Sequence, residues 1–273
     1  MCLRYSKEMN LNSKFALITG TTSGIGKAFA DLLADLGYNI VLVSRDEIRM
    51  KQQALELRDR AGVNVELLFA DLTLQRDRDL VVRRLEERAR PIEILVNNAG
   101  FGINSDFANS SIKMQQDLIE CMVTSTLQFS HAVIPSMKQI GSGYIINVSS
   151  VAGFMAGSTY CSAKSWVTNF SESLHKELAP HGINIHVICP GFTKTEFHLR
   201  CKQDVSGVPN IFWLKPERVA SLAYSNVLKG KVLSVPGFHY KLLVALHSYA
   251  PRCVVRGYGS LAKRFLRRGG RNL

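Results

Sequence analysis

The feature that most limits the fold of this chain is a glycine-rich turn between an apolar strand and an amphipathic helix. Phe15–Thr19 is a short apolar run with the character of a buried strand. It leads directly into the turn Gly20–Gly26, and apolar residues at helical spacing then run from Lys27 to Leu36. Gly37 supplies a helix stop, and Asn39–Val43 is the next strand. These pieces predict a βαβ unit of the size that binds dinucleotides.

The glycines of the turn have a physical purpose in such a unit. They let the backbone approach a pyrophosphate closely, and the helix that follows offers unpaired N–H groups and the positive end of its dipole. Glycines also serve turns in general, so the prediction depends on the strand before the turn and the helix after it. Both are present, and we therefore expect a nucleotide at this turn.

The end of the second strand distinguishes the two nicotinamide dinucleotides. A carboxylate there binds the ribose hydroxyls of NAD and repels a 2′-phosphate, whereas an arginine does the reverse. The sequence has Ser44 and Arg45 at this point, and Asp46 starts the next helix. We therefore expect NADP (NADPH) as the cofactor, with Arg45 among the residues that bind it. An arginine that merely ends a strand at the surface is the alternative.

Strands and helices continue to alternate along the rest of the chain. This pattern predicts an α/β fold, a doubly wound parallel sheet of the Rossmann type, with ligands at the carboxyl ends of the strands. Asp71, Asn97 and Gly100 each follow an expected strand and fall at that edge. The further strands are expected over 63–69, 92–96, 144–148 and 183–188, and the further helices over 47–60, 74–90, 112–137, 158–178 and 216–228.

A tyrosine and a lysine lie four residues apart at the start of one expected helix. Tyr160 and Lys164 therefore share a helix face and reach one small region. An ammonium beside a phenol favours the phenolate and lowers the tyrosine pKa from about 10, which makes a proton donor and acceptor near neutral pH. The same spacing is common on solvated helices, so the pair by itself is weak support for an active site.

The composition bounds the class of protein. A chain of 273 residues with 46% hydrophobic residues can bury the core of one large domain. Its six cysteines form no Cys-x-x-Cys or Cys/His cluster, which predicts neither a metal site nor a disulfide framework and fits a reducing compartment. The N-terminus has no signal-peptide core, and no apolar run reaches the roughly 18 residues of a spanning helix. We expect a cytoplasmic protein.

The positive charge of the chain is concentrated at its C-terminal end. Eleven of the twelve net positive charges follow Glu217, and no Asp or Glu occurs after that residue. We expect a catalytic domain over 12–229 and a basic amphipathic extension over 230–273. Apolar residues mixed with Lys and Arg predict peripheral contact with an intracellular membrane surface. Packing on a partner subunit is the alternative, and nucleic acid is disfavoured because no base-stacking aromatics accompany the charges.

In their order and context, the motifs resemble those of the short-chain dehydrogenase/reductase family over about residues 12–228. The resemblance implies an enzyme that transfers a hydride between a nicotinamide and a carbonyl or alcohol. The matching motifs are Thr19-Gly20-x-x-x-Gly24-Ile25-Gly26, Asp71, Asn97-Asn98-Ala99-Gly100, Ser149-Ser150, Tyr160-x-x-x-Lys164 and Pro190-Gly191-x-x-x-Thr195.

The resemblance also implies roles for individual residues. Tyr160 would be the general acid or base for the substrate oxygen, and Ser150 would hydrogen-bond that oxygen. Lys164 would lower the Tyr160 pKa and hold the nicotinamide ribose. The remaining cofactor-binding residues would be Gly20, Ser23, Gly24, Ile25 and Gly26 at the pyrophosphate, Asp71 at the adenine, Asn97 on the adenosine side and Thr195 at the carboxamide end.

Two features depart from the family pattern. Met122 stands where the family usually has an asparagine at a helix kink, whose backbone carbonyl holds a water that leads to the lysine. Because that contact is made by the main chain, a methionine can preserve it. Ser150 and Tyr160 are ten residues apart, about three fewer than usual, so we expect a reshaped loop beside the substrate pocket. Ser149 or Ser158 is the alternative source of the hydroxyl.

The segment between the last expected strand and the last expected helix would cover the substrate. Residues 196–215 contain eight apolar side chains and few charges. We therefore expect a small hydrophobic alcohol or carbonyl as substrate, such as a steroid, a retinoid or another lipid, although packing of this segment on the body explains the pattern equally well. A homo-oligomer is also expected. The competing expectation is an NADP-binding protein with weak or no catalysis that acts as a membrane-associated scaffold or redox sensor.

Overall fold

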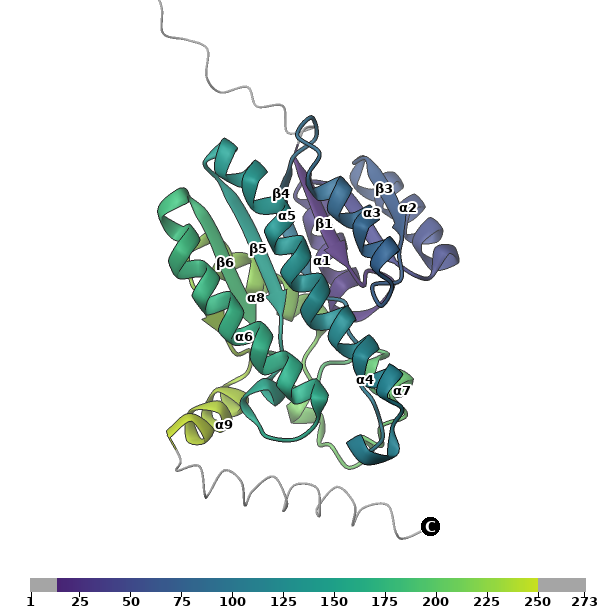
Figure 1. Ribbon diagram of the computed structural model, residues 1–273, viewed down its shortest axis with the longest axis vertical. Helices are drawn as coiled ribbons and strands as arrows, with labels where there is room; N and C mark the ends of the chain where they lie inside the picture. Colours follow the sequence, from purple (N-terminus) through teal and green to yellow (C-terminus); the bar gives the residue numbers. More distant parts are fainter. Residues whose placement is uncertain (1–13, 250–273) are drawn as a thin grey trace, which may run out of the picture.

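The computed structural model describes residues 14–249, in which seven strands form one parallel sheet with helices on both faces (Figure 1). The strand order is β3-β2-β1-β4-β5-β6-β7. This is the predicted doubly wound α/β sheet of the Rossmann type. The strands are β1 (Phe15–Thr19), β2 (Asn39–Ser44), β3 (Val65–Phe69), β4 (Ile92–Asn97), β5 (Gly143–Val148), β6 (Ile183–Ile188) and β7 (Leu233–Ser234).

Successive strand residues point to opposite sides of the sheet, and in the central strands the residues on both sides are mostly apolar. Helices therefore cover both faces. The longer helices are α1 (Gly24–Asp35), α2 (Glu47–Ala61), α3 (Gln75–Leu85), α4 (Ile112–Ile119), α5 (Ser125–Ile140), α6 (Thr159–Leu178), α8 (Pro216–Leu228) and α9 (Phe238–Tyr249). The short ones are η2 (Phe107–Asn109), η3 (Glu120–Thr124), η4 (Val151–Phe154), η5 (Ala179–His181), α7 (Phe197–Arg200) and η6 (Asn210–Phe212). Apolar residues of α1, α2 and α8 belong to one core cluster, and those of α3 and α5 to the cluster on the opposite face.

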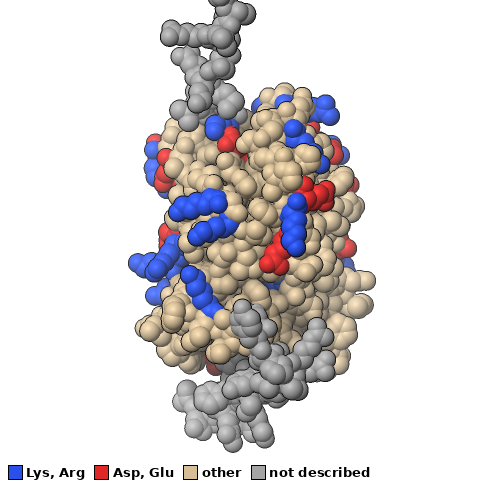
Figure 2. All heavy atoms as spheres, turned by 90° about the vertical axis from the view of Figure 1, so that its left-hand side faces the viewer, with Lys and Arg blue, Asp and Glu red and all other residues tan. Residues whose placement is uncertain are grey.

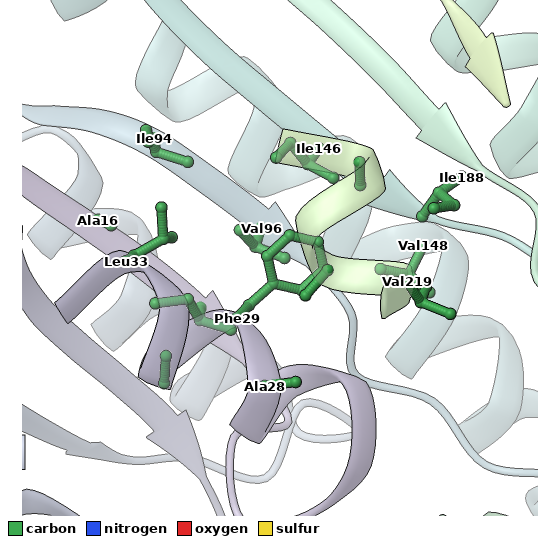
Figure 3. Close-up of a cluster of buried hydrophobic side chains, with 14 of the residues drawn as sticks. Ala16, Ala28, Phe29, Leu33, Ile94, Val96, Ile146, Val148, Ile188 and Val219 are labelled. Carbon is green, nitrogen blue, oxygen red and sulfur yellow. The ribbon is translucent and has the colours of Figure 1, made fainter. Parts of the chain in front are cut away.

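Phe29 lies at the centre of one of the two cores (Figure 3). Its ring extends from α1 toward β4 and α8 and lies beside Val96 and Val219. Phe29 is fully buried, and burial of such a side chain contributes about 1.5–3 kcal/mol. This packing fixes the position of α1, whose first turn carries the glycine-rich segment.

The expected helix over 112–137 is interrupted. A π-helical turn, η3, separates α4 from α5 and contains Met122. The helix then continues through Pro135 to Ile140, and Gly141 ends it with a φ of 75°. A π-helical turn inside a helix is frequent at functional sites, and this one lies next to the start of α6.

The sheet continues beyond residue 229, where the catalytic domain was predicted to end. Leu233 and Ser234 pair in parallel with Val187 and Ile188 of β6, which places β7 at one edge of the sheet, opposite β3. The first part of the predicted extension therefore belongs to the body of the protein, while its residues 250–273 lie outside the described part of the chain. Among residues 14–249, no helix is both long and apolar enough to cross a bilayer.

Candidate active site

The glycine-rich turn lies at the carboxyl edge of the sheet, beside the boundary between β1 and β4 where the strand order reverses. Gly20 and Gly24 have φ values of 71° and 58°, in the left-handed region that favours glycine. A Cβ atom at Gly26 would lie 2.1 Å from the carbonyl oxygen of Gly20, which is too close for any side chain. The conformation of the turn therefore depends on glycine at all three positions.

A polar network from the end of β4 holds this turn in place. The side-chain amide of Asn98 donates to the carbonyl oxygens of Thr19 at 2.8 Å and Gly20 at 3.1 Å. The Thr19 hydroxyl accepts from the backbone N–H groups of Asn98 and Ala99 at 2.9 and 3.0 Å. Asn98 was not among the predicted site residues, although its place in Asn97-Asn98-Ala99-Gly100 was a signal that could have identified it.

The turn fits an anionic group. Ser23 precedes α1, but its side chain makes no capping hydrogen bond, so the positive end of the helix remains available. Thr21 Oγ1 is buried without a hydrogen-bond partner among the described residues. Thr195 lies against the turn, since a Cβ atom at Gly24 would be 2.7 Å from its Cγ2 atom, and Ile25 packs on the core behind it. The pyrophosphate of a dinucleotide suits this cradle.

Arg45 and Asp71 face each other across the ends of β2 and β3. The Arg45 Nη1 atom lies 3.5 Å from Asp71 Oδ2, and the arginine side chain is 62% exposed. Burial acts to raise the pKa of Asp71, but hydrogen bonds from Thr73 and the charge of Arg45 outweigh it and hold this pKa below its usual value. Asp46 accepts a hydrogen bond from the Arg49 backbone N–H and caps α2, as predicted. Arg45 is therefore the exposed charge at the end of β2.

The Asn97 side chain is buried, and its contacts lie within the body of the protein. Its amide donates to Asn147 Oδ1 at 2.9 Å and to Ser130 Oγ at 3.4 Å. Asn147 in turn donates to Ser171 Oγ at 2.8 Å. The network ties β4 to β5 and to the helices α5 and α6 below the site. A contact between Asn97 and the cofactor stays a prediction.

Tyr160 and Lys164 lie in the first turns of α6, as their spacing predicts. The Lys164 Nζ atom donates to the carbonyl oxygen of Val148 at 2.7 Å and lies 5.8 Å from the centroid of the Tyr160 ring. Burial lowers the pKa of Lys164 to about 8. Burial also raises the pKa of Cys121 and of Cys189 to about 11, so the sulfur atoms near the ammonium are neutral thiols.

Ser150 lies close enough to Tyr160 for its hydroxyl to affect the pKa of the phenol. Burial raises the pKa of Tyr160, and the hydrogen bond with Ser150 acts in the opposite direction. The pKa of Tyr160 therefore lies above its usual value, whereas its spacing to Lys164 predicted a lowered one. The reason is that withdrawal of the phenol from water disfavours the phenolate and dominates the shift. The Lys164 ammonium, meanwhile, donates to the Val148 carbonyl.

The two alternative serines have other contacts. Ser149 is buried, and its hydroxyl donates to the Lys164 carbonyl oxygen at 2.8 Å and lies 2.8 Å from Thr168 Oγ1. Ser158 is exposed, with its hydroxyl 3.7 Å from Cys161 Sγ. Of the three serines that the sequence offered, Ser150 is thus the one beside the phenol.

The short loop between Ser150 and Tyr160 closes through the tight turn η4. The Ser150 Oγ atom accepts a hydrogen bond from the Ala152 backbone N–H at 3.1 Å. Gly153 lies directly on α6, because a Cβ atom there would be 2.8 Å from the carbonyl carbon of Lys164. This close approach keeps Ser150 next to Tyr160 although the loop is shorter than the family pattern.

Met122 lies in the π-helical turn and is 2% exposed. It belongs to a small buried cluster with Ala163, against which Tyr160 packs. Its carbonyl oxygen accepts a hydrogen bond from the Thr126 hydroxyl at 2.8 Å. The kink that the resemblance implied is therefore present with methionine in place of asparagine, while the water relay through its carbonyl stays a prediction.

Aromatic side chains face the phenol from the segment after β6. The Phe197 ring of α7 lies 5.6 Å from the Tyr160 ring, measured between centroids. The rings of Phe197, Phe192 and Trp213 each contact the His198 ring. Phe192 and Trp213 lie 5.6 Å apart between centroids, so these four rings form one cluster, which we call the aromatic wall. Cys201 ties the segment to the loop after β4 by accepting a hydrogen bond from the Gly102 backbone N–H at 3.2 Å. The aromatic wall thus meets the Tyr160 ring through Phe197.

This arrangement of glycine turn, strand-end polar groups and Ser-Tyr-Lys set matches a known family. The family model for short chain dehydrogenases matches residues 14–205. The chain belongs to the short-chain dehydrogenase family. This short-chain dehydrogenase is an oxidoreductase of a family that binds a nicotinamide cofactor, which is the group that the turn fits. Within residues 14–249, no three His, Cys, Asp or Glu side chains cluster as a metal site.

Curated relatives of this short-chain dehydrogenase include bacterial oxidoreductases. An uncharacterized oxidoreductase of Staphylococcus saprophyticus is 34% identical over 190 residues, which cover 68% of this chain and 81% of that protein. The 3-oxoacyl-[acyl-carrier-protein] reductase of Vibrio cholerae is 32% identical over 191 residues, which cover 69% of this chain and 77% of that protein.

Solved structures agree with this assignment. A short-chain dehydrogenase from Sphingobium yanoikuyae in complex with NADPH has a TM-score of 0.80 at 35% identity, over 90% of this chain and 95% of that one. The bulky-bulky ketone specific alcohol dehydrogenase from Comamonas testosteroni has a TM-score of 0.75 at 29% identity, over 88% of this chain and 96% of that one. Both likenesses extend beyond residue 205 and support the fold of the whole described body.

Proposed function

We propose that this short-chain dehydrogenase uses NADP(H) to interconvert a hydrophobic carbonyl compound and its alcohol, with Tyr160 as general acid and base. The observation that carries the proposal is that Ser150 and Lys164 both lie beside the Tyr160 phenol, next to an aromatic wall. Bound nicotinamide supplies the hydride chemistry. The residues of the chain position the substrate oxygen and move its proton.

The proton chemistry follows from the burial of the site. The raised pKa of Tyr160 keeps its hydroxyl protonated near neutral pH, which is the state that gives a proton to a carbonyl oxygen during reduction. The Ser150 hydroxyl donates a hydrogen bond to the same oxygen and stabilises the negative charge that develops there. The charge of Lys164, close to the phenol ring, then stabilises the phenolate that remains.

The preference for NADP(H) rests on the charge at the end of β2. Arg45 is exposed there and can turn from Asp71 to a 2′-phosphate, which it would bind through charge-assisted hydrogen bonds. Asp46, the nearest carboxylate in sequence, is engaged as the cap of α2. The presence of NADPH in the related structure from Sphingobium yanoikuyae also favours this cofactor.

The substrate class rests on the wall opposite the phenol. Phe197 faces the phenol and is joined through His198 to Phe192 and Trp213, and this aromatic cluster favours an apolar substrate such as a steroid, a retinoid or another lipid-like carbonyl. The structural relative from Comamonas testosteroni is specific for bulky-bulky ketones, which is consistent with a large apolar group on each side of the carbonyl.

The decisive experiment measures NADPH oxidation with a panel of steroid, retinoid and other hydrophobic ketones and aldehydes. We expect turnover, and we expect Tyr160→Phe to lower kcat/KM by about 10²–10⁴-fold because the proton donor is lost. Tyr144→Phe is the matched control, since Tyr144 lies in β5 away from the phenol of Tyr160. Tight NADPH binding without turnover of any carbonyl would contradict the proposal and favour the cofactor-binding scaffold or redox sensor instead.

A second measurement tests the cofactor. Arg45→Ala should weaken NADPH binding relative to NADH by about tenfold or more, because a hydrogen-bonded charge pair with the phosphate is lost. Arg76→Ala is the control, because Arg76 is an 82% exposed arginine on α3. Equal affinity of the unaltered protein for NADH and NADPH would refute the role of Arg45.

We further propose that the protein is a homo-oligomer. Leu127 and Ile140 of α5 are about half exposed, and Trp166 and Phe170 form a partly exposed aromatic stack on α6. Helices with such faces pair readily with a second copy. Light scattering of the purified chain tests this, and a monomer at micromolar concentration would contradict it.

A further inference from the structure

The last described helix, α9, is apolar on two opposite faces. Tyr240 is buried on the side that meets the body, and Val244 packs there one turn later. On the other side, Phe238, Leu242 and Leu246 are 80%, 51% and 64% exposed and follow one another at intervals of four residues. α9 therefore exposes a row of apolar side chains on the face that the body does not cover.

Tyr240 anchors α9 to the walls of the substrate site. Its hydroxyl accepts from the Phe192 backbone N–H at 2.9 Å and donates to the Phe212 carbonyl oxygen at 2.8 Å. Its ring lies on Gly191, where a Cβ atom would come within 1.9 Å of it. The Phe212 ring also meets His239 at 5.0 Å between centroids. α9 is therefore held rigidly beside the segment that covers Tyr160.

That covering segment exposes apolar side chains at the same end of the molecule. Leu199 of α7 is 79% exposed and Ile211 of η6 is 76% exposed. α7 and α9 both lie at the lower end of the molecule in Figure 1, toward which the carboxyl ends of the strands point. We call the set Leu199, Ile211, Phe238, Leu242 and Leu246 the apolar rim, because these residues belong to α7, η6 and α9, near the end of the sheet where the first turn of α6 carries Tyr160.

The positive charge of the C-terminal part of the chain indicates which kind of partner the apolar rim would bind. From Arg218 to the end the chain contains no acid, and residues 250–273, which follow α9 directly, carry seven Lys and Arg residues. Figure 2 shows Lys and Arg side chains, together with acidic ones, on the upper and middle parts of one face of the molecule. Exposed Arg200, Lys202 and Lys241 lie beside these apolar side chains. An apolar surface with cations beside it, followed in the sequence by a cationic segment, matches an anionic lipid bilayer, whose headgroups attract the cations while its interior takes the apolar side chains.

We propose that the apolar rim is a docking surface for an anionic membrane, with the substrate site opening toward the lipid. This goes beyond the proposed reaction, because docking depends on the rim and does not require turnover. The placement also deepens the proposed substrate class, since an apolar carbonyl compound would pass from the bilayer to Tyr160 without crossing water. Phe197 on α7 forms the inner side of the same segment whose outer side carries Leu199.

Sedimentation of the full-length protein with vesicles tests the proposal. We expect weak binding to pure phosphatidylcholine, and stronger, salt-sensitive binding to an equimolar mixture of phosphatidylcholine and phosphatidylglycerol. The double variant Leu242→Glu/Leu246→Glu should reduce the partition coefficient by about tenfold or more, because two side chains can no longer enter the bilayer.

The control variant is Ile48→Glu/Leu55→Glu. These residues are 83% and 54% exposed on α2, distant from α9 in Figure 1, and the substitution changes the net charge by the same amount. It should retain most of the binding. Equal losses in both variants would show a purely electrostatic attraction and overturn the docking role of the rim, as would the absence of binding in the unaltered protein.

Two further measurements separate the other occupants of the rim. Light scattering without lipid reports whether a second copy covers it, and a change of oligomeric state in Leu242→Glu/Leu246→Glu would overturn the proposal. The variant Arg264→Gln/Arg267→Gln/Arg268→Gln tests the basic segment alone. If it abolishes binding while the rim variant has no effect, the rim is not the docking surface. Circular dichroism and NADPH binding confirm that each variant is folded, and they are independent of turnover.

Discussion

The ammonium of Lys164 lies 5.8 Å from the centroid of the Tyr160 ring and donates its hydrogen bond at 2.7 Å to the carbonyl oxygen of Val148. The lysine is thereby held by the end of a central strand, and only 5% of it is exposed. The phenol gains a fixed positive charge nearby, and the fold keeps an ammonium away from water. Burial of a charge is unfavourable, so the charged lysine lowers the free energy of unfolding of the protein.

Replacement of Lys164 should abolish activity without lowering the stability of the fold. Burial lowers the pKa of Lys164 from 10.5 to about 8. Below pH 8 the lysine is charged in the folded state, and its burial then lowers the free energy of unfolding. As the pH rises from about 8 toward 10.5, the folded state loses that proton before the unfolded state does, so the unfavourable contribution of this group to stability shrinks toward zero. We expect Lys164→Met to lose activity and to unfold at a denaturant concentration no lower than the unaltered protein.

The pH dependence of this effect provides its control. The stability difference between Lys164→Met and the unaltered protein should be largest below pH 8 and should shrink toward pH 10.5. Urea unfolding followed by circular dichroism measures it. If the stability difference is constant over this range, or if Lys164→Met is strongly destabilised at neutral pH, the buried charge of Lys164 does not destabilise the fold.

The rate of carbonyl reduction should fall in alkaline solution. The raised pKa of Tyr160 keeps the phenol protonated over the neutral range, so the first group to lose its proton is Lys164, at about pH 8. Loss of the ammonium removes the charge that stabilises the phenolate. We expect kcat/KM for reduction to be flat near neutral pH and to decrease above about pH 8. A decrease that begins below neutral pH would assign the titration to another group.

Gly191 should tolerate no side chain, because the ring of Tyr240 lies on it. A Cβ atom there would be 1.9 Å from Tyr240 Cζ, so Gly191→Ala must displace the ring and break its hydrogen bonds to the Phe192 and Phe212 backbone. We expect a loss of about 1–3 kcal/mol in the free energy of unfolding. Gly207→Ala is the control, because nothing lies within 4 Å of a Cβ atom at that position.

Met122 should act in the site through its backbone. Its carbonyl bonds to Thr126, and its side chain is buried among apolar residues. Met122→Leu should therefore keep kcat/KM near that of the unaltered protein and cost less than about 1.5 kcal/mol of stability. Met122→Asn, which restores the family residue, should cost about 1–3 kcal/mol because it buries an amide without a partner. Chemical unfolding and NADPH oxidation measure both variants, and a large gain of activity in Met122→Asn would show that the side chain limits proton transfer.

Much of the fold followed from local patterns in the sequence. Phe15–Thr19 and the glycines after it predicted the first βαβ unit, and β6 and α8 begin and end at the expected residues. These predictions worked because strand and helix periodicity is set by which faces are buried. The edge strand β7 was missed, since two residues are too few to show any period.

Part of the active site also followed from the sequence, and part of it only from the tertiary structure. The sequence by itself determined the order of the motifs and the spacing of Tyr160 and Lys164, because these are properties of one helix and of strand ends. The tertiary structure alone decided that Asn98 holds the glycine turn and that Ser150 stays beside the phenol through the Gly153 contact.

The tertiary structure also decided the direction of the Tyr160 pKa, which the spacing to Lys164 had predicted wrongly. Spacing along a helix shows which charges lie near one another, but the pKa of a partly buried phenol also depends on how far the rest of the fold removes it from water. That removal is produced by segments far apart in the sequence, here α4 to η3, α7 and η4. Local patterns therefore predicted the chemistry of the groups in this site, and long-range packing set their protonation.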